Sequence, residues 1–445
     1  MRKFDTKVQY LKYKVLREVA RQAWNDTLLD NVLSIPRELA PRNAETIYCC
    51  VYKERAILSE RVRMAMGGNK QNPNVIEVID IACDECPMGG YEVTNSCRGC
   101  LARRCEDVCP KGAISFHNHV AYIDKAKCVD CGACARVCPY SAIVDRKRPC
   151  ENACKIKAIT MNENKAAAID NDTCISCGAC VYQCPFGAIT DKSYILNVID
   201  MIKKSEENRK YHVYAVIAPS ISSQFTYAKL GQVIAGIHLL GFSEIVEAAL
   251  GADMVSYKES EELAEKGFLL SSCCPAFVKY VQIQFPMMAD KISENLSPMA
   301  TIAKYIKEQR DPDAKIVFIG PCTSKKMEFQ KEEVRPYIDS VITFEELQAL
   351  FDGLAYESGT EFCVQFKKGN YHIHLPIRIR GAKNLTVRGN RATILAHFDP
   401  TAPIWANNNV FELSDCEDTS FHDFFFDTDH PVSAAGRVTS IDREN

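Results

Sequence analysis

The spacing of the cysteines constrains this chain more than any other feature. Sixteen of its 23 cysteines lie between Cys83 and Cys184. Two runs, one from Cys128 to Cys138 and one from Cys174 to Cys184, read C-x2-C-x2-C-x3-C-P, and an Ala-Ile pair follows each. In such a run three thiolates on one tight loop hold three irons of a 4Fe–4S cluster, and the fourth cysteine ligates a neighbouring cluster. The repeated run predicts that the chain carries electrons.

The composition of the chain excludes several other classes of protein. Its 445 residues are 47% hydrophobic and 25% charged, which is typical of a globular protein. The net charge of −3 provides no field that attracts a polyanion, so we expect no nucleic-acid partner. No run of about 18 apolar residues occurs, so we expect no membrane span. The charged N-terminus lacks the apolar segment of a signal peptide, and we expect a reducing cytoplasmic location.

A variant run and two partial motifs supply the other cysteines of this region. The variant, C-x2-C-x4-C-x3-C-P from Cys97 to Cys109, pairs with the Cys128 run as in a two-cluster ferredoxin. Zinc also uses C-x2-C pairs and remains an alternative for Cys83 and Cys86. We therefore expect two to four 4Fe–4S clusters. Cross-ligation predicts four ligand sets: Cys97, Cys100 and Cys105 with Cys138; Cys128, Cys131 and Cys134 with Cys109; Cys174, Cys177 and Cys180 with Cys154; and Cys83 and Cys86 with Cys150 and Cys184.

The first 190 residues divide into two parts. Residues 83–190 are expected to form ferredoxin-like cluster domains with short strands and turns. Residues 1–82 are expected to form an N-terminal α/β region, in which Cys49 and Cys50 are interpreted as buried thiols of a strand. The apolar periodicity of that region predicts helices at 5–24 and near 53–66, with strands at 47–51 and 75–81.

Strands and helices alternate from residue 211 to 354, after a predicted helical connector at 191–210. This alternation favours an α/β layer with its chemistry at the carboxyl ends of the strands. The last two predicted strands each run directly into a cysteine motif. The predicted elements are strands at 213–218, 267–270 and 316–319 and a helix at 226–241.

Residues 361–445 have a different composition, which is rich in Asn, Asp, Thr and His and includes short β-prone runs. The segments beginning at Ala382 and at Cys416 look like two versions of one turn-plus-strand unit, which resembles the rungs of a parallel β-helix. The whole pattern predicts a multidomain protein of α+β and α/β class that ends in a β-rich tail.

Two motifs give residues 80–354 a resemblance to the catalytic domain of iron-only (FeFe) hydrogenases. The first reads Ser-Ser-Cys-Cys-Pro-Ala-Phe from Ser271 to Phe277, and the second reads Pro-Cys-Thr-Ser-Lys-Lys-Met-Glu from Pro321 to Glu328. The resemblance implies a site, called the H-cluster, in which a 4Fe–4S cluster joins a two-iron subsite. It also implies reversible reduction of protons to H2 and a soluble ferredoxin, or a similar carrier, as the electron partner.

The resemblance assigns roles to individual residues of this chain. Cys274 and Cys322 are implied ligands of the catalytic 4Fe–4S cluster. Cys273 is the implied free thiol that passes protons to the two-iron subsite, and Lys325 is implied to bind one of its cyanide ligands. The implied proton path to Cys273 consists of Glu259, Glu262 and Ser293.

A departure from the family follows residue 354. The third motif of the family, which resembles M-A-C-x-G-G-C and supplies two further cluster cysteines, is absent from the printed sequence. Beyond Cys322 only Cys363 and Cys416 occur, and each is isolated. We expect residues 211–354 to be a partial catalytic domain and residues 361–445 to be a foreign segment, best explained by a disrupted or chimeric gene. Two hypotheses remain: a hydrogenase-family enzyme with an incomplete site, or a non-catalytic electron carrier or sensor.

Overall fold

The computed structural model describes residues 4, 6–43, 46–84, 86, 89–354, 362–374, 377–380, 382–397, 410–414 and 416–428. The chain divides into two compact units, Met1–Leu354 and Ala355–Asn445, and each is described by itself. Among the described helices, none is both long and apolar enough to cross a bilayer.

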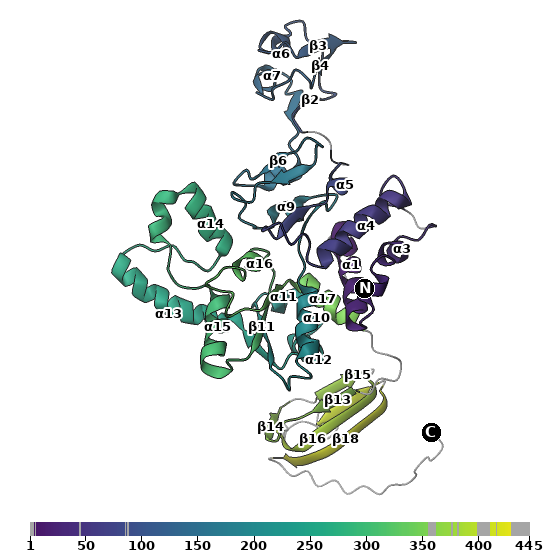
Figure 1. The fold of residues 1–445 in the computed structure, drawn as a ribbon, viewed down its shortest axis with the longest axis vertical. Coiled ribbons are helices and arrows are strands. Elements are labelled where there is room, and N and C mark those ends of the chain that lie inside the picture. Colours follow the sequence, from purple (N-terminus) through teal and green to yellow (C-terminus); the bar gives the residue numbers. More distant parts are fainter. Residues whose placement is uncertain are drawn as a thin grey trace. The chain divides into compact units, whose positions relative to one another are not determined.

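The N-terminal region is helical (Figure 1). Helix α1 (Lys7–Trp24) begins at a capping box, in which Thr6 and Gln9 exchange side-chain and backbone hydrogen bonds. Its buried face packs against α17 (Phe344–Gly353) and α10 (Ile195–Lys204). Three more helices surround it: α2 (Leu28–Asn31), α3 (Ile35–Leu39) and α4 (Val51–Ala65).

The strand predicted at residues 47–51 is wrong. These residues form a bend that leads into α4 at Val51, and the thiols of Cys49 and Cys50, predicted to be buried, are exposed. A short apolar run does not distinguish a strand from the approach to a helix. Ile47, with 62% of its surface exposed, has no neighbouring strand to cover it.

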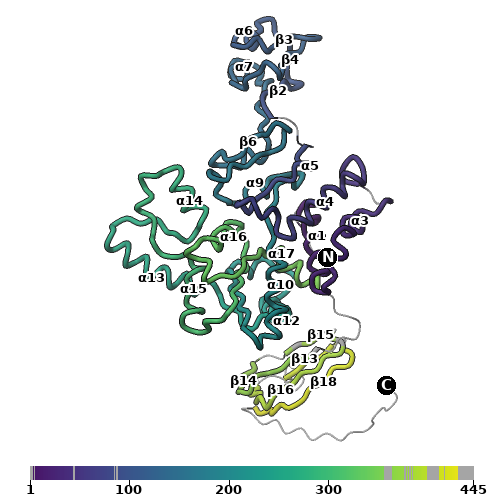
Figure 2. The backbone as a smooth tube through the Cα atoms, viewed as in Figure 1, coloured from purple at the N-terminus to yellow at the C-terminus, as the bar shows by residue number. Residues whose placement is uncertain are grey.

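The cluster-binding region contains one ferredoxin-like fold with a second inserted into it. In the outer fold β1 (Ile76–Val78) pairs antiparallel with β8 (Ile189–Asp191). In the insert β2 (Tyr91–Val93) pairs with β5 (Ile143–Asp145). Figure 2 shows the backbone leaving the outer fold near α5, running through the insert and returning towards β6. The other elements are α5 (Asp80–Cys83), α8 (Pro149–Ala153), β6 (Ile159–Met161), β7 (Ala167–Ile169) and α9 (Ala179–Gln183) in the outer fold, and α6 (Arg104–Asp107), β3 (Ile114–His117), β4 (Val120–Ile123) and α7 (Ala133–Val137) in the insert.

A four-stranded parallel sheet forms the next layer, in the order β10-β9-β11-β12. All five residues of β9 (Val213–Ile217) are buried, as expected for a parallel strand covered on both faces. The other strands are β10 (Glu244–Glu247), β11 (Lys315–Ile319) and β12 (Ser340–Ile342), and the helices are α11 (Ile221–Gln224), α12 (Leu230–Leu239), α13 (Ala248–Lys266), α14 (Pro275–Gln284), α15 (Pro298–Tyr305) and α16 (Lys325–Glu328).

The strand predicted at residues 267–270 is also wrong. Gly267 ends α13 in a left-handed conformation with a φ of 72°, which glycine adopts without strain. After it, Leu270 makes one isolated bridge to Ile292 and does not join the sheet. The sheet instead uses β10 and β12, which the sequence analysis missed because both are short.

The second unit consists of parallel strands that stack as successive rungs. Strand β16 (Lys383–Ala396) pairs with β13 (Phe362–Gln365), β14 (Asn370–Ile373) and β18 (Glu417–Thr428). Strand β15 (Ile377–Arg380) pairs with β17 (Phe411–Ser414). All these pairs are parallel, which is the arrangement of a β-helix.

Candidate iron–sulfur centres and catalytic site

One backbone turn recurs after the last cysteine of each run. The alanine four residues further on donates its backbone N–H to the cysteine Sγ, and the residue before that alanine has a positive φ. The alanine is buried, and the isoleucine after it begins a strand, which explains the repeated Ala-Ile pair. The four bonds are Ala113 to Cys109 (3.3 Å), Ala142 to Cys138 (3.4 Å), Ala158 to Cys154 (3.2 Å) and Ala188 to Cys184 (3.2 Å), after Gly112, Ser141, Lys157 and Gly187.

The fold brings the cysteines together in the four sets that cross-ligation predicts. Two cavities lie in the inserted fold, and a third lies in the outer fold. In the fourth set, burial and the nearby thiolates of Cys174, Cys177 and Cys154 raise the pKa of Cys180 to about 12. The three cavities are lined by Cys97, Cys100, Cys105 and Cys138; by Cys109, Cys128, Cys131 and Cys134; and by Cys83, Cys86, Cys150 and Cys184.

These donor sets fit clusters better than single metal ions. In the described part of the chain, no three His, Cys, Asp or Glu side chains lie close enough to hold one metal ion. The spacing of the two full runs, C-x2-C-x2-C-x3-C-P, is the one that 4Fe–4S clusters use. Backbone N–H groups donate to cysteine sulfurs in all four sets, and such hydrogen bonds help to set the reduction potential of a 4Fe–4S cluster. A bound cluster supplies one-electron chemistry at each position.

Arg148 is a buried cation at the third set. Only 3% of its surface is exposed, its Nη1 lies 3.5 Å from Cys83 Sγ, and its Nη2 donates to Cys86 O at 3.2 Å. Burial raises the pKa of Cys86, and the guanidinium charge opposes this effect. A cation at this distance favours the more negative, reduced form of whatever the thiolates hold.

Replacing Arg148 by glutamine is expected to lower the midpoint potential of one cluster by about 60 mV or more, a tenfold change for one electron. The matched control is Arg146→Gln, because Arg146 is exposed and pairs with Glu92 at the surface. A redox titration followed by electron paramagnetic resonance measures the midpoint potentials of both variants. Unchanged potentials in a folded Arg148→Gln chain would contradict the role given to this charge.

The two motifs outside the cluster folds lie against each other. Cys274 caps the N-terminus of α14, and Cys322 follows β11 at the carboxyl edge of the sheet. Lys325 Nζ donates to Cys273 O at 3.2 Å and forms a buried ion pair with Glu328 at 2.7 Å. Residues 267–270 form no strand, so the two motifs do not meet at one edge of the sheet. The side chain of Lys325 links them instead.

Glu259 is linked to the first motif by hydrogen bonds. Its Oε1 accepts from Ser271 Oγ at 2.9 Å and from the backbone N–H of Ser272 at 3.2 Å. The backbone N–H of Cys273 donates to the same Ser271 Oγ at 3.4 Å. Ser271 thus connects the predicted proton carrier Glu259 to the backbone of the predicted free thiol.

Glu262 and Ser293 form the outer part of the predicted path. Ser293 Oγ donates to Glu262 Oε2 at 2.8 Å, and Asn295 Nδ2 donates to the same oxygen at 2.9 Å. Burial would raise the pKa of Glu262, but hydrogen bonds from Lys266 and Ser293 outweigh it and lower the pKa. Ser272 Oγ donates to Asn295 O at 2.6 Å, so this outer group also contacts the first motif.

The loop of the Cys174 set contacts the second motif and helix α14, which begins within the first motif. Thr323 Oγ1 and Ser324 Oγ donate to Ser176 O at 3.0 and 3.3 Å, and Lys279 Nζ, from α14, donates to Cys174 O at 2.7 Å. Gly178 permits this approach, because a Cβ there would lie 2.6 Å from Thr323 Oγ1. A cluster held by this loop lies next to the predicted catalytic cysteines.

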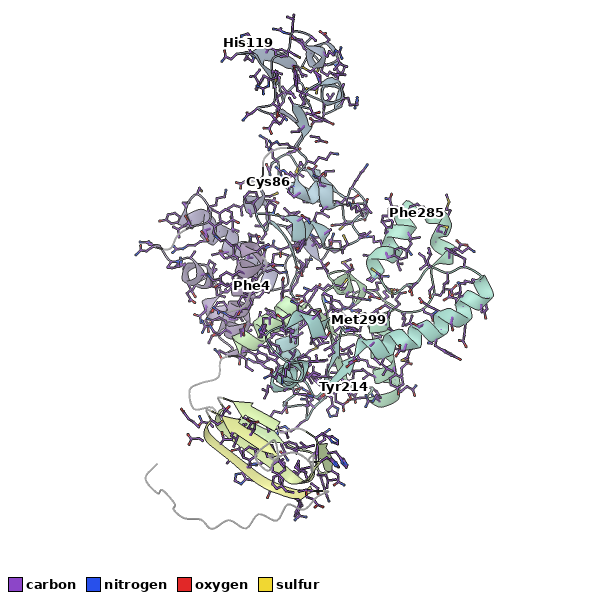
Figure 3. The ribbon with its side chains drawn as sticks, turned by 180° about the vertical axis from the view of Figure 1, so that it is seen from behind. Phe4, Cys86, His119, Tyr214, Phe285 and Met299 are labelled. Carbon is purple, nitrogen blue, oxygen red and sulfur yellow. The ribbon has the colours of Figure 1, made fainter. Side chains whose placement is uncertain are left out.

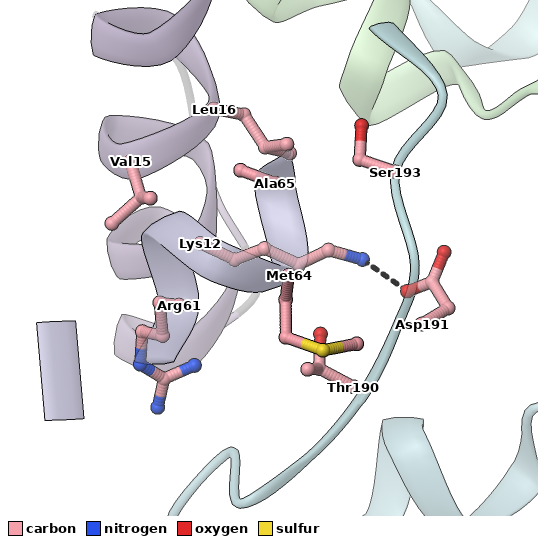
Figure 4. A pocket seen from close by; sticks show the side chains of 9 residues that line it. All are labelled: Lys12, Val15, Leu16, Arg61, Met64, Ala65, Thr190, Asp191 and Ser193. Carbon is pink, nitrogen blue, oxygen red and sulfur yellow. Dashed lines mark hydrogen bonds and ion pairs between the residues drawn. The ribbon is translucent and has the colours of Figure 1, made fainter. Parts of the chain in front are cut away.

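The sequence analysis missed a buried charge network centred on Lys326. The side chain of Lys326 is fully buried, and its Nζ lies 2.8 Å from Asp191 and 2.7 Å from Glu346. Lys12 of α1 reaches the other oxygen of Asp191 at 2.6 Å (Figure 4). The members of this network are far apart in sequence, and the only sequence feature that pointed to it was the Lys-Lys doublet of the second motif.

Known proteins match both the cluster folds and the sheet domain. The family described as "Iron only hydrogenase large subunit, C-terminal domain" matches residues 211–371. A 4Fe–4S dicluster domain matches residues 96–142, and a 4Fe–4S binding domain matches residues 167–190. The chain contains a domain of the iron-only hydrogenase family together with 4Fe–4S domains. The resemblance seen in the two motifs is thereby confirmed, as is the presence of 4Fe–4S clusters.

The relatives match this chain over less than two thirds of their own length. Iron hydrogenase 1 of Clostridium pasteurianum is 30% identical over 175 residues, which are 34% of this chain and 30% of that protein. The periplasmic Fe hydrogenase large subunit of Nitratidesulfovibrio vulgaris is 30% identical over 256 residues, 52% of this chain and 56% of that protein. A cytosolic Fe–S cluster assembly factor of Kluyveromyces lactis is 33% identical over 107 residues, 22% of this chain and 23% of that protein.

The H-cluster does not fit the cysteines of the two hydrogenase motifs. Cys274 and Cys322 are two of the four thiolates that its 4Fe–4S part needs. In the part of the tail that the structure describes, Cys363 is exposed, and Cys416 Sγ lies 3.6 Å from Ile379 O within the second unit.

Proposed function

We propose that the chain is an electron-transfer protein that passes single electrons through four 4Fe–4S clusters to the region of Cys274 and Cys322. The observation that carries this proposal is the contact of the Cys174 loop with the second hydrogenase motif, through Thr323, and with α14 beside the first motif, through Lys279. A soluble ferredoxin or similar carrier exchanges electrons with the clusters, in the reducing cytoplasm where thiolates persist.

The residues of the chain have separate parts in this function. The sixteen cysteines hold the clusters, and the N–H groups of the following alanines stabilise the thiolate charge. Arg148 favours the reduced form of the Cys83 set. Lys325, paired with Glu328, fixes the backbone at Cys273 beside the end of the route.

A reductive titration tests the proposal. The anaerobically reconstituted chain is expected to accept about four electrons, one for each cubane. Dithionite is added stepwise, and the paramagnetic signals are integrated at each step. Uptake of no electrons, with no paramagnetic signal, would overturn the proposal.

Hydrogen chemistry is the second candidate function, favoured by the hydrogen-bonded groups around Glu259 and Glu262. Protons and H2 would then be its substrates, and the two carboxylates would carry protons towards Cys273. With two of four cluster thiolates present, we expect no H2 uptake or evolution from these 445 residues after treatment with hydrogenase maturation proteins. Measurable turnover, lowered by Glu262→Gln, would establish this candidate and overturn the expectation.

A further inference from the structure

The first cluster loop of the inserted fold differs from the others in length and charge. Between Cys100 and Cys105 it has four residues, where the Cys128 and Cys174 runs have two at the same place. The extra length exposes Leu101, 99% of whose surface is accessible, together with Arg103 and Arg104. The corresponding residues of the other two runs are Gly-Ala in both cases, so the extension is specific to this site.

The loop is held in a defined shape. Arg103 has a φ of 38°, a left-handed conformation that is unusual for a residue with a side chain. Its guanidinium lies 4.6 Å from the centre of the Phe116 ring and 3.6 Å from the Glu106 carboxylate. Gly99 packs so closely on the β3–β4 turn that a Cβ would lie 1.9 Å from the backbone oxygen of His119, which Figure 3 labels.

The same loop forms the wall of a cluster cavity. Arg98, Arg104 and Tyr140 line the cavity with Cys97, Cys100, Cys105 and Cys138. A protein that contacts these arginines therefore lies against the cluster with no other domain between them. Tyr140 is 53% exposed and, with Leu101, adds apolar surface beside the cations.

We propose that the Cys97–Cys105 loop is the docking surface for a small, acidic, one-electron carrier protein. This rests on the proposed electron-transfer function. Three exposed arginines lie in this loop, Arg98, Arg103 and Arg104, and they outnumber the two acidic residues that follow it, Glu106 and Asp107. The excess positive charge attracts a partner of opposite charge. Leu101 gives the contact an apolar centre, which desolvates on docking.

The test compares two doubly substituted chains, reconstituted in full. The variant L101S/R103E changes the loop without touching a residue that lines the cavity. The control L33S/K210E makes the same chemical changes at Leu33, which is 84% exposed, and at the exposed Lys210. Stopped-flow absorbance follows cluster reduction by a reduced, strongly acidic two-cluster ferredoxin, and separately by dithionite.

We expect the ferredoxin reaction of L101S/R103E to slow at least tenfold at low ionic strength, with the difference shrinking as salt rises. The L33S/K210E control is expected to match the wild-type rate. Dithionite is expected to reduce all three chains equally. Equal ferredoxin rates for L101S/R103E and wild type would overturn the docking surface alone. Failure of dithionite to reduce any cluster in the wild-type chain would overturn the proposed function and the docking surface with it.

Discussion

Replacing Cys180 by alanine is expected to lower the iron content of the purified chain by about four atoms, the content of one cubane. Cys180 is buried, and its thiol lies among those of Cys174, Cys177 and Cys154, so no exposed residue replaces it as a ligand. Because this set lies against the hydrogenase motifs, the remaining clusters lose their connection to Cys274 and Cys322. Iron analysis and integrated paramagnetic signals measure the loss.

Two double variants test whether ligands cross between runs. Adding Cys154→Ala to Cys180→Ala removes a second ligand of the same set, so the iron content is expected to fall no further. Adding Cys150→Ala instead removes a ligand of the Cys83 set, and the loss is expected to double to about eight irons. Cys363→Ala, at an exposed cysteine of the second unit, is the control. If adding Cys154→Ala lowered the iron content further and adding Cys150→Ala did not, the assignment of Cys154 and Cys150 to their sets would be refuted.

Replacing Asp191 by asparagine is expected to destabilise the first unit by about 3 kcal/mol, because the buried Lys326 then keeps only Glu346, and Lys12 only Glu345, as a carboxylate partner. Lys326 is fully buried, and Asp191 is its partner at 2.8 Å and that of Lys12 at 2.6 Å. Lys12 belongs to α1, Asp191 is the last residue of β8 and Lys326 lies in the second motif, so the network joins three segments. Chemical denaturation of the reconstituted chain measures the change.

The surface pair of Asp200 and Lys204 provides the control for Asp191→Asn. Both its side chains are more than half exposed, so Asp200→Asn is expected to leave the free energy of unfolding nearly unchanged. Equal effects of the two substitutions would contradict the importance of the buried network.

The pH dependence of the network follows from its pKa directions. Burial would raise the pKa of Asp191, but the cations of Lys12 and Lys326 outweigh it and hold the pKa well below its usual range. The pKa of Asp191 is lower in the folded chain than in the unfolded chain, so its carboxylate stabilises the fold above about pH 4. This stabilisation is lost as the pH falls towards the pKa of the folded state. The difference in stability between wild type and Asp191→Asn is therefore expected to stay constant from about pH 5 to 8 and to shrink in stronger acid.

The sequence predicted local chemistry well, because ligand spacing is a property of one short loop. The C-x2-C-x2-C-x3-C-P runs carry their own geometry, and the structure gathers the cysteines in the sets expected from cross-ligation. The long helix α1 was predicted because its apolar periodicity is strong over many residues, and β9 because its five residues form an unbroken apolar run.

The sequence analysis failed where tertiary contacts decide the outcome. Residues 47–51 and 267–270 are short apolar runs, and neither finds a strand partner in the fold. The link of Lys326 to Asp191 spans 135 residues along the chain, and no local pattern announces such a pair. Arg148 was missed likewise, because its importance comes from the burial of its guanidinium beside Cys83.

The count of iron and acid-labile sulfide per chain tests the central claim most directly. Anaerobically reconstituted protein is expected to contain about sixteen atoms of each, with four 4Fe–4S clusters visible by Mössbauer spectroscopy. A chain that binds zinc instead, or one that stays colourless with its cysteines unligated, would contradict the account.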